Sequence, residues 1–386
     1  MTPKGSLLTT FVSFVAIGHK AKVLGWTTNR PMWVATQQQG HKFKRTLHMS
    51  RNNQEDLYGA IHRKEYEMAR FKKEHQSTTD PIQIAMGYAQ ERQPKLRMAK
   101  ALRRIYEDSD YNPDDAKWQF TKDFESQTSL PMRRGSLVVD IKRKSLSSTR
   151  PYANFDDAGL VAQAMISFGA DAVFVNVDYT AYGGDLSELR NAVTAVRRAS
   201  PTAAVIMKDI VVDEIQIGIA KDAGADGILL MASVLGPALP NFLDLCTTVG
   251  IEAIVEVHTK NELDSALSNL AQNLLVTNYD RITGQYFADQ ALKLVGLFPG
   301  TGPIVALACG GIDTPEQVRE LLCAGYDGVV VGKALMGNPS AGQFIRNVRD
   351  KPLLPAEFAG WGLDDVDVNI QGTFTTTAAD KTHDWQ

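Results

Sequence analysis

The chain has 386 residues, of which 44% are hydrophobic and 22% are charged, and its formal net charge is −3. This composition is typical of a globular protein and argues against a nucleic-acid-binding domain, which is usually strongly basic. The three cysteines, Cys246, Cys309 and Cys323, show no metal-type spacing and are too few for a disulfide framework. The length suits one barrel-sized domain of roughly 250 residues with additional segments.

Residues 1–50 differ from the rest of the chain in charge. No acidic residue precedes Glu55, whereas the first 51 residues contain eight Lys and Arg residues. An acid-free basic leader is typical of organelle targeting. The apolar run Leu7–Gly18 is too short for a membrane span and would suit the hydrophobic region of a signal peptide. We therefore expect a targeting leader for the plastid, with a mitochondrial transit peptide or an unstructured tail as the alternatives.

Residues 51–130 are expected to form a helical extension. Within 55–74, apolar residues such as Leu57 and Ile61 recur at helical spacing and charged residues fill the opposite face. A second helical stretch is expected over about 82–107. These helices precede the part of the chain in which strands are predicted.

Residues 131–350 alternate short apolar runs with longer amphipathic runs, which is the pattern of βα units around a parallel sheet. Eight strands are expected: Leu137–Ile141, Ala172–Val177, Ala204–Lys208, Gly227–Met231, Glu252–Val257, Leu274–Thr277, Ile304–Ala308 and Gly328–Val331. Eight strands with helices between them favour a (β/α)8 TIM barrel over an open doubly wound sheet, which usually has fewer strands. Residues 351–386 lose the alternation and are expected to be a polar C-terminal tail.

A short repeat supports the use of one βα unit several times. The runs Gly169-Ala170-Asp171, Gly224-Ala225-Asp226 and Gly325-Tyr326-Asp327 each stand directly before a predicted strand. Glycine ends a helix readily because it adopts the left-handed conformation at little steric cost. The repeat is therefore evidence of architecture and not of function.

The active site of such a barrel lies at the C-terminal ends of its strands. Asp140 and Lys142 stand at the end of the first predicted strand, Lys208 ends the third, and Glu256 lies near the end of the fifth. Asn278 follows the sixth. A poorly solvated ammonium has a depressed pKa and can donate a proton near neutral pH, while a carboxylate can accept one. Lys142, Lys208 and Glu256 are therefore the candidate acid–base set, with Asp140 and Asn278 as further candidate site residues, and a purely structural ion-pair network is the alternative.

Two glycine turns follow the last two strands. Gly310 and Gly311 come after the seventh strand, and Gly332 and Lys333 come after the eighth, where barrels often bind phosphate. Glycine allows backbone N–H groups to approach phosphate oxygens, and a following helix would add its positive end. We therefore expect a phosphate site at these turns, with a further charge from Lys333.

Other residues near the strand ends are expected to have supporting roles. Tyr182 and Met231 are expected to line an apolar pocket. His258 is expected to support Glu256 or to pack beneath it. Cys309 has no evident histidine partner and is expected to be inert.

Over about residues 55–350 the chain resembles the indole-3-glycerol phosphate synthase family of tryptophan biosynthesis. The motifs that carry the resemblance are DIKRKS at 140–145, YGGDL at 182–186, MKDIVVD at 207–213, AGADGILL at 223–230, IVEVH at 254–258 and VGKALM at 331–336. The family closes an indole ring on 1-(2-carboxyphenylamino)-1-deoxyribulose 5-phosphate with loss of CO₂ and water, and it needs no metal or organic cofactor.

The resemblance also implies roles for individual residues. Lys208 would be the general acid and Glu256 the general base. Lys142 would pair with a carboxylate or phosphate of the substrate, and Asn278 would hold a hydroxyl. The substrate phosphate would be surrounded by Ser145, Gly311, Gly332 and Lys333. Tyr182 would pack on the anthranilate ring.

Several positions depart from the usual family pattern. Asp140 replaces a glutamate, Gly310 replaces a serine, Leu146 replaces a proline, and Asp280 and Arg281 stand where the family has a single arginine. Two other functions would fit such a pocket: an enzyme for another phosphorylated sugar, or a non-catalytic paralogue that serves as an assembly subunit. The expected partners are a phosphorylated small molecule and other tryptophan-pathway enzymes, with neither nucleic acid nor, for the mature protein, a membrane.

Overall fold

The computed structural model describes residues 55–87, 96–102, 135–146, 148, 150–298, 304–349, 366–368 and 374–376. The leader expected over residues 1–50 lies outside the described residues, as does most of the tail expected over 351–386.

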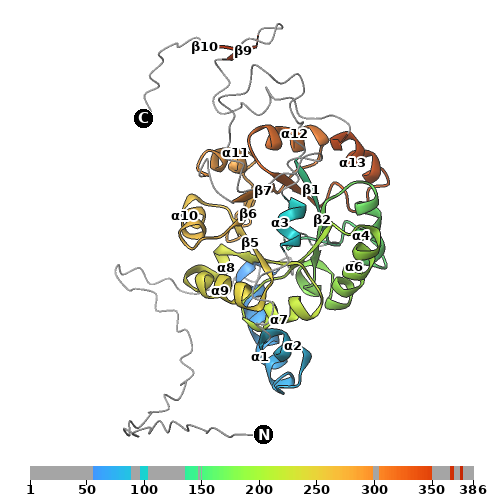
Figure 1. Ribbon diagram of the computed structural model, residues 1–386, viewed down its shortest axis with the longest axis vertical. Coiled ribbons are helices and arrows are strands. Elements are labelled where there is room, and N and C mark those ends of the chain that lie inside the picture. Colours follow the sequence, from blue (N-terminus) through green and yellow to red (C-terminus); the bar gives the residue numbers. More distant parts are fainter. Residues whose placement is uncertain are drawn as a thin grey trace, which may run out of the picture. The chain divides into compact units, whose positions relative to one another are not determined.

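Eight parallel strands close into a barrel in chain order, and the first strand pairs with the last (Figure 1). The strands are β1 (Ser136–Ile141), β2 (Ala172–Asn176), β3 (Ala204–Lys208), β4 (Gly227–Met231), β5 (Glu252–Val257), β6 (Asn273–Thr277), β7 (Val305–Cys309) and β8 (Gly328–Val331). The predicted TIM barrel is confirmed, and each strand boundary lies within one residue of its predicted position.

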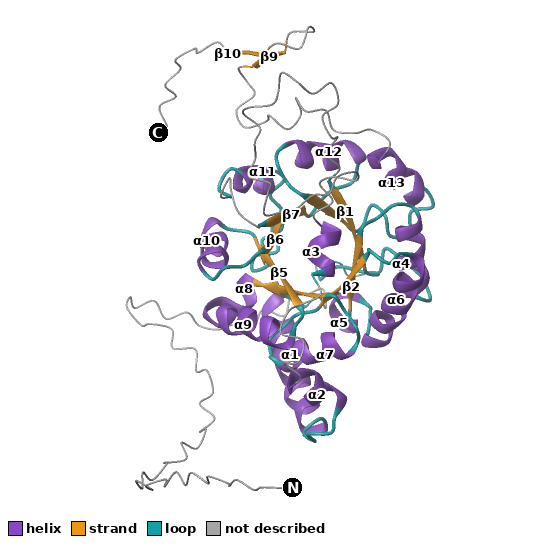
Figure 2. Cartoon of the chain, viewed as in Figure 1, coloured by secondary structure: helices purple, strands orange, loops and turns teal. Residues whose placement is uncertain are grey.

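Helices form a ring outside the strands (Figure 2). They are α4 (Ala158–Ser167), α5 (Tyr179–Tyr182), α6 (Leu186–Ala199), α7 (Ile215–Asp222), α8 (Ala232–Leu235), the 3₁₀ helix Gly236–Ala238, α9 (Leu239–Val249), α10 (Lys260–Ser268), α11 (Gln290–Val295), α12 (Pro315–Cys323) and α13 (Ala341–Arg349). None of the helices in the described part of the chain is long and apolar enough to cross a membrane.

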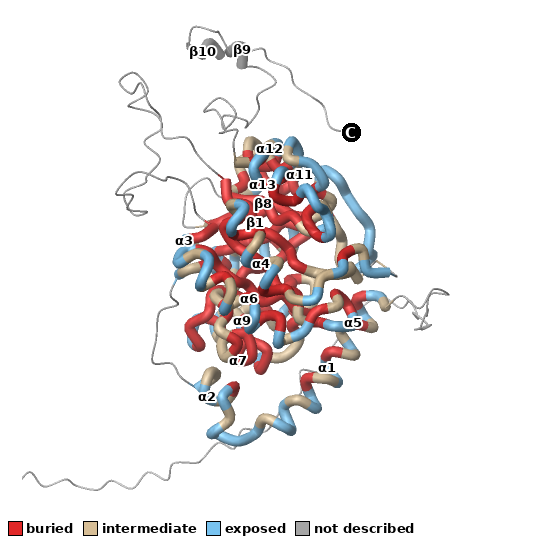
Figure 3. The backbone as a smooth tube through the Cα atoms, turned by 90° about the vertical axis from the view of Figure 1, so that its right-hand side faces the viewer, coloured by how far each residue is buried: buried red, intermediate tan, exposed pale blue. Residues whose placement is uncertain are grey.

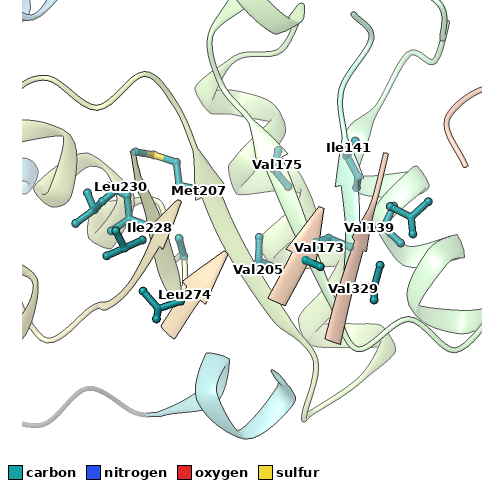
Figure 4. Close-up of a cluster of buried hydrophobic side chains, with 14 of the residues drawn as sticks. Val139, Ile141, Val173, Val175, Val205, Met207, Ile228, Leu230, Leu274 and Val329 are labelled. Carbon is teal, nitrogen blue, oxygen red and sulfur yellow. The ribbon is translucent and has the colours of Figure 1, made fainter. Parts of the chain in front are cut away.

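The strands separate two layers of apolar side chains, because successive residues of a strand point to opposite faces. Residues such as Val139, Val173 and Val205 belong to the larger layer between strands and helices (Figure 4). Their neighbours, including Val138 and Phe174, belong to a second cluster inside the barrel. The strands are therefore buried on both faces, and Figure 3 draws their residues in the colour of buried positions. This explains why they read as continuous apolar runs in the sequence.

The Gly-x-Asp repeat joins neighbouring strands at the N-terminal end of the barrel. Each repeat glycine has a positive φ, 113° at Gly169 and 82° at Gly224, for example. Each repeat aspartate then accepts a hydrogen bond from a backbone N–H of the preceding strand: Asp171 from Leu137 at 2.8 Å, Asp226 from Val205 at 2.9 Å and Asp327 from Ala306 at 2.8 Å. The repeat is structural, as expected, and it sets the register of strand pairs at the N-terminal end of the barrel.

The N-terminal extension contains three described helices. α1 (Leu57–Glu74) begins after Asp56, whose carboxylate accepts a 2.7 Å hydrogen bond from the Gly59 N–H, and it confirms the first predicted helix. The second prediction, one helix over 82–107, is wrong as a continuous element. The described part of that stretch holds two short helices, α2 (Pro81–Gly87) and α3 (Arg97–Leu102). Leu96, directly before α3, has a φ of 49°, which interrupts a right-handed helix.

α3 closes the N-terminal end of the barrel. Its first backbone N–H groups, those of Met98 and Ala99, donate to the buried carboxylate of Glu252 at 2.6 and 2.9 Å. Met98 and Leu102 belong to the cluster inside the barrel. Gly227 is required here, because a side chain at this position would collide with the Met98 sulfur. The side chains of α3 therefore fill this end of the barrel interior.

In the tail, β9 (Val366–Val368) pairs antiparallel with β10 (Phe374–Thr376). These six residues are the only described part of 351–386.

Candidate active site

Strand alternation brings the expected acid–base residues together at the C-terminal end of the barrel. The clusters inside the barrel contain Val138, Ile206 and Ile254, and the next inward position on each of their strands carries a charge. Those positions are Asp140, Lys208 and Glu256, which are 4%, 4% and 2% exposed. The polar residues are thus the last inward-facing layer above an apolar core.

Asp140 is the hub of one half of this layer. Its carboxylate accepts hydrogen bonds from the Lys142 Nζ, from the Lys208 Nζ at 3.2 Å and from the Asn176 amide at 2.7 Å. The Lys208 Nζ also lies 5.7 Å from the centre of the Phe174 ring. Two ammonium groups therefore share one carboxylate, which leaves a net positive charge at this side of the mouth.

The pKa values follow from this arrangement. Burial alone would raise the pKa of Asp140, but Lys142 and Lys208 hold it well below its usual range. Burial lowers the pKa of Lys142, and the nearby Lys208 adds to this effect. Burial opposes the charge of Lys208 too, yet Asp140 and Glu256 together raise its pKa. The expected depression of a lysine pKa thus holds for Lys142, and it is wrong for Lys208.

Glu256 anchors the other half of the layer through Arg281. The Arg281 guanidinium donates from Nε and Nη2 to the two carboxylate oxygens at 2.6 and 2.8 Å. Although burial raises the pKa of Glu256, the paired Arg281 lowers it overall, with a further contribution from Lys208. Such a two-point pair fixes the carboxylate orientation and keeps it ionised.

Asp280 and Arg281, which stand where the family has a single arginine, point in different directions. Asp280 turns away into its own loop, where it accepts hydrogen bonds from the Ile282 and Thr283 N–H groups at 2.8 and 3.2 Å. Asp280 therefore stabilises the turn after β6, and the turn directs Arg281 to Glu256. The negative charge of Asp280, which would repel a phosphate, is therefore stabilised by N–H donors of its own loop.

Asn278 and His258 both brace the loops of the mouth. The Asn278 amide donates to the Gly310 carbonyl oxygen at 3.0 Å, and its Oδ1 accepts from the Ala291 N–H at 2.8 Å. The His258 Nδ1 donates to the Thr277 carbonyl oxygen at 2.8 Å, and its ring lies 5.4 Å from that of Phe287. His258 thus packs among the loops, and no hydrogen bond between it and Glu256 occurs in the described residues.

An apolar cluster lies beside the charged layer. Tyr182 and Met231 are both buried and belong to one cluster with Ile210 and with Ala60 of α1. The Tyr182 hydroxyl faces the charges of Arg281, Lys208, Glu256 and Asp140. Tyr182 and Met231 therefore share one buried apolar cluster, and Tyr182 lies near the acid–base residues.

A buried network of ion pairs connects α1 to this side of the barrel. The Lys64 Nζ lies 2.7 Å from Asp178 and 3.1 Å from Asp209, the residue that follows Lys208. Asp178 also accepts a hydrogen bond from Arg63 at 3.0 Å and caps α5, the helix that carries Tyr182. The N-terminal extension is thus attached to two strand ends of the catalytic face.

The glycine turns are formed, but their surroundings differ from the expectation. Gly310 and Gly311 have φ values of 99° and 69°, and the loop after β6 covers them with Tyr279 and Tyr286. Gly332 lies against Asp140 and Lys142. The chain after Gly332 forms a turn and α13 begins only at Ala341, so no helix starts at this turn. Lys333 is exposed, and Ser145 lies in the β1–α4 loop.

Sequence reasoning missed two residues of the layer. Asn176, at the end of β2, bridges Asp140 and the Ile141 carbonyl oxygen through its amide, at 2.7 and 2.9 Å. Asn176 lies two residues after the inward-facing Phe174, so strand alternation could have predicted that it points into the barrel. Arg281 gave no comparable signal, because the fold of its loop decides where it points.

Within the described residues, no group of three or more His, Cys, Asp or Glu side chains could hold a metal ion. The arrangement offers instead two ammonium groups, two carboxylates and a guanidinium around one mouth. Such a set can protonate an oxygen, accept a proton and bind an anion.

The chain is similar in sequence to known proteins of one family. The family model for indole-3-glycerol phosphate synthase matches residues 87–348. The chain is 33% identical to the indole-3-glycerol phosphate synthase of Chloroherpeton thalassium over 233 residues, which cover 56% of this chain and 86% of the relative. It is 31% identical to that of Thermoanaerobacter pseudethanolicus over 201 residues, which cover 52% of this chain and 74% of the relative.

Among solved structures, thiamine phosphate pyrophosphorylase from Pyrococcus furiosus is 18% identical, with a TM-score of 0.42, over 56% of this chain and 94% of that one. This likeness is too slight to bear on the site. The family match covers more than half of the chain, and the relatives are covered over most of their length. The chain therefore belongs to the indole-3-glycerol phosphate synthase family.

Proposed function

We propose that the protein is an indole-3-glycerol phosphate synthase, a carboxy-lyase that acts in tryptophan biosynthesis. Its substrate is 1-(2-carboxyphenylamino)-1-deoxyribulose 5-phosphate. The observation that supports this most directly is the meeting of Lys208 and Glu256 in one buried layer beside the apolar cluster of Tyr182. The aromatic ring of the substrate is proposed to bind on the side of this cluster, and its phosphate on the side of the glycine turns.

The protonation states suit an acid and a base. Because its pKa is raised, Lys208 is a cationic proton donor at neutral pH, and it can protonate the substrate oxygen as the ring closes and as water leaves. Because its pKa is lowered, Glu256 is ionised and can accept a proton. Lys142 and Lys208 exceed the charge of Asp140, so this side of the mouth also attracts the substrate's anionic groups.

Asn278 is proposed to hold a substrate hydroxyl with the amide hydrogen that its contacts to Gly310 and Ala291 leave available. Ser145, Gly311, Gly332 and Lys333 are proposed to surround the phosphate. Tyr182 is proposed to pack on the anthranilate ring, since it lies in the apolar cluster beside Lys208.

The test is a turnover assay on the protein that starts near Met49, with the carboxyphenylamino-deoxyribulose phosphate as substrate and indole fluorescence as the signal. Turnover that disappears in Lys208→Ala is the expected result. A folded protein that binds inorganic phosphate but produces no indole would contradict the proposal and favour another phosphorylated sugar.

We further propose that residues 1–50 direct the protein to the plastid. The support is the basic, acid-free composition of this segment. A fluorescent protein fused behind residues 1–50 is expected to accumulate in plastids, and mitochondrial or cytosolic fluorescence would contradict this address.

Association with other tryptophan-pathway enzymes is also proposed, because the product of one step is the substrate of the next. Co-purification of the next pathway enzyme with the tagged full chain, at low salt and not at high salt, is the expected result. Elution of the two enzymes as separate species under both conditions would contradict the association.

A further inference from the structure

Two tyrosines of the loop after β6 cover the turn at Gly310 and Gly311, and a third, Tyr152, belongs to the β1–α4 loop. Tyr279 and Tyr286 face each other across the loop after β6, where they form an isolated antiparallel bridge with ring centroids 4.9 Å apart. Tyr152 belongs to the β1–α4 loop, and its hydroxyl is close enough to Tyr279 for the two to interact electrostatically. None of the three has a role in the function proposed above.

Tyr286 lies directly over one glycine turn. A side chain at Gly311 would run into the ring and the hydroxyl oxygen of Tyr286, so this glycine leaves room for the tyrosine. The hydroxyl donates to no described residue, and the Tyr286 side chain is 45% exposed. A hydrogen-bond donor is therefore held, uncommitted, where the substrate phosphate is proposed to bind.

The Tyr152 hydroxyl is buried and has no hydrogen-bond partner in the part of the chain that the structure describes. Burial raises the pKa of Tyr152, and the nearby Ser145 side chain lowers it by less. Buried polar groups without partners are rare because they are unfavourable. The backbone nevertheless fixes this residue: its N–H donates to the Arg143 carbonyl oxygen at 2.9 Å, and its own carbonyl packs against Gly337 of the β8 loop.

We propose that Tyr152 and Tyr286 are the hydroxyl donors of the phosphate site, and that they enclose the phosphate between the β1–α4 loop and the loop after β6. The inference rests on the proposed function, because the phosphate is that of its substrate. Each phenol donates one hydrogen bond to a phosphate oxygen and no proton is transferred. Burial raises the pKa of both phenols, as do Asp140 near Tyr152 and Asp313 near Tyr286, so both remain protonated donors.

The experiment compares Tyr152→Phe and Tyr286→Phe with the matched control Tyr66→Phe, whose hydroxyl lies on α1 at a residue that is 76% exposed. For each variant, the KM of the carboxyphenylamino-deoxyribulose phosphate and the inhibition constant of inorganic phosphate are measured, together with thermal unfolding. Each site variant is expected to raise both constants roughly tenfold while kcat changes little. The control is expected to match the wild type.

Thermal unfolding separates this role from a structural one. Because the Tyr152 hydroxyl has no described partner, Tyr152→Phe is expected to unfold at the same temperature as the wild type or higher, while its phosphate affinity falls. A lower unfolding temperature with unchanged phosphate inhibition would show a structural hydroxyl and overturn the proposal for Tyr152.

Tyr286→Ala tests whether the ring only occupies the site. Tighter phosphate inhibition in Tyr286→Ala, with no change in Tyr286→Phe, would show that the ring blocks the phosphate and would overturn the proposal for Tyr286. The proposed function and this inference can also fail separately. If the wild type forms no indole-3-glycerol phosphate, but inorganic phosphate stabilises the wild type and not the two Phe variants, only the proposed function is contradicted. If the wild type turns over normally and both variants keep the wild-type KM and phosphate inhibition constant, only this inference is contradicted.

Discussion

The two halves of the charged layer are built differently. On the β1–β3 side, two lysines share Asp140. On the β5–β6 side, Glu256 and Arg281 form a one-to-one pair held at two points. The first half has spare positive charge, and Asp140 keeps a cationic partner when either lysine is removed, whereas the second half is neutral and each member depends on the other. We therefore expect the first half to carry most of the catalysis and the second to be the more fragile.

The largest expected effect is on turnover, in the first half. Lys208→Ala removes the proposed general acid and is expected to lower kcat by about 10²–10⁴-fold. Lys142 can still pair with Asp140, so the fold should be kept. Steady-state kinetics measure the kcat of Lys208→Ala, and circular dichroism checks that the variant is folded. A folded variant that keeps at least a tenth of the wild-type kcat would show that Lys208 is not the general acid.

The second effect is on stability, in the other half. Arg281→Ala leaves Glu256 buried and without its two-point partner, and it is expected to lower the free energy of unfolding by about 3–5 kcal/mol. Urea denaturation measures the loss. The double variant Arg281→Ala/Glu256→Gln is expected to recover part of it, because no unpaired charge remains; equal stability of the two variants would contradict the account.

A pH profile sharpens the comparison. Asp140 favours the charged forms of both lysines, so Asp140→Asn is expected to lower the pKa of Lys142 and Lys208. A cationic group with a lowered pKa loses its proton at lower pH. The alkaline limb of the kcat/KM profile should therefore move to lower pH in Asp140→Asn, and a shift in the opposite direction would rule out this electrostatic coupling.

The smallest expected effect is the stability change on removing the second lysine. Lys142→Ala leaves Asp140 bonded to Lys208 and Asn176, so no buried charge is left unpaired and the loss in the free energy of unfolding should be well below that of Arg281→Ala. Urea denaturation of both variants under one set of conditions makes the comparison. Equal losses would show that the two halves do not differ in redundancy.

The sequence predicted one half of the layer better than the other. Asp140, Lys142 and Lys208 end or directly follow strands, and strand alternation is regular enough to place them from the sequence alone. Glu256 was placed in the same way. Its partner Arg281 was not, because it lies in a loop in which Asp280 and Thr283 determine the turn. The tyrosines that cover Gly310 and Gly311 were missed for the same reason.

The sequence by itself determined the barrel, its strand boundaries and the family, because periodic burial and short motifs are written locally along the chain. Only the tertiary structure decided that Lys208 has a raised pKa while that of Lys142 is lowered, that Asn278 braces two loops, and that α1 is bonded to the strand ends through Lys64. These properties depend on which charges and donors meet across loops that are distant in sequence. Electrostatic and hydrogen-bond energies change steeply with such distances, so residue order along the chain does not specify them.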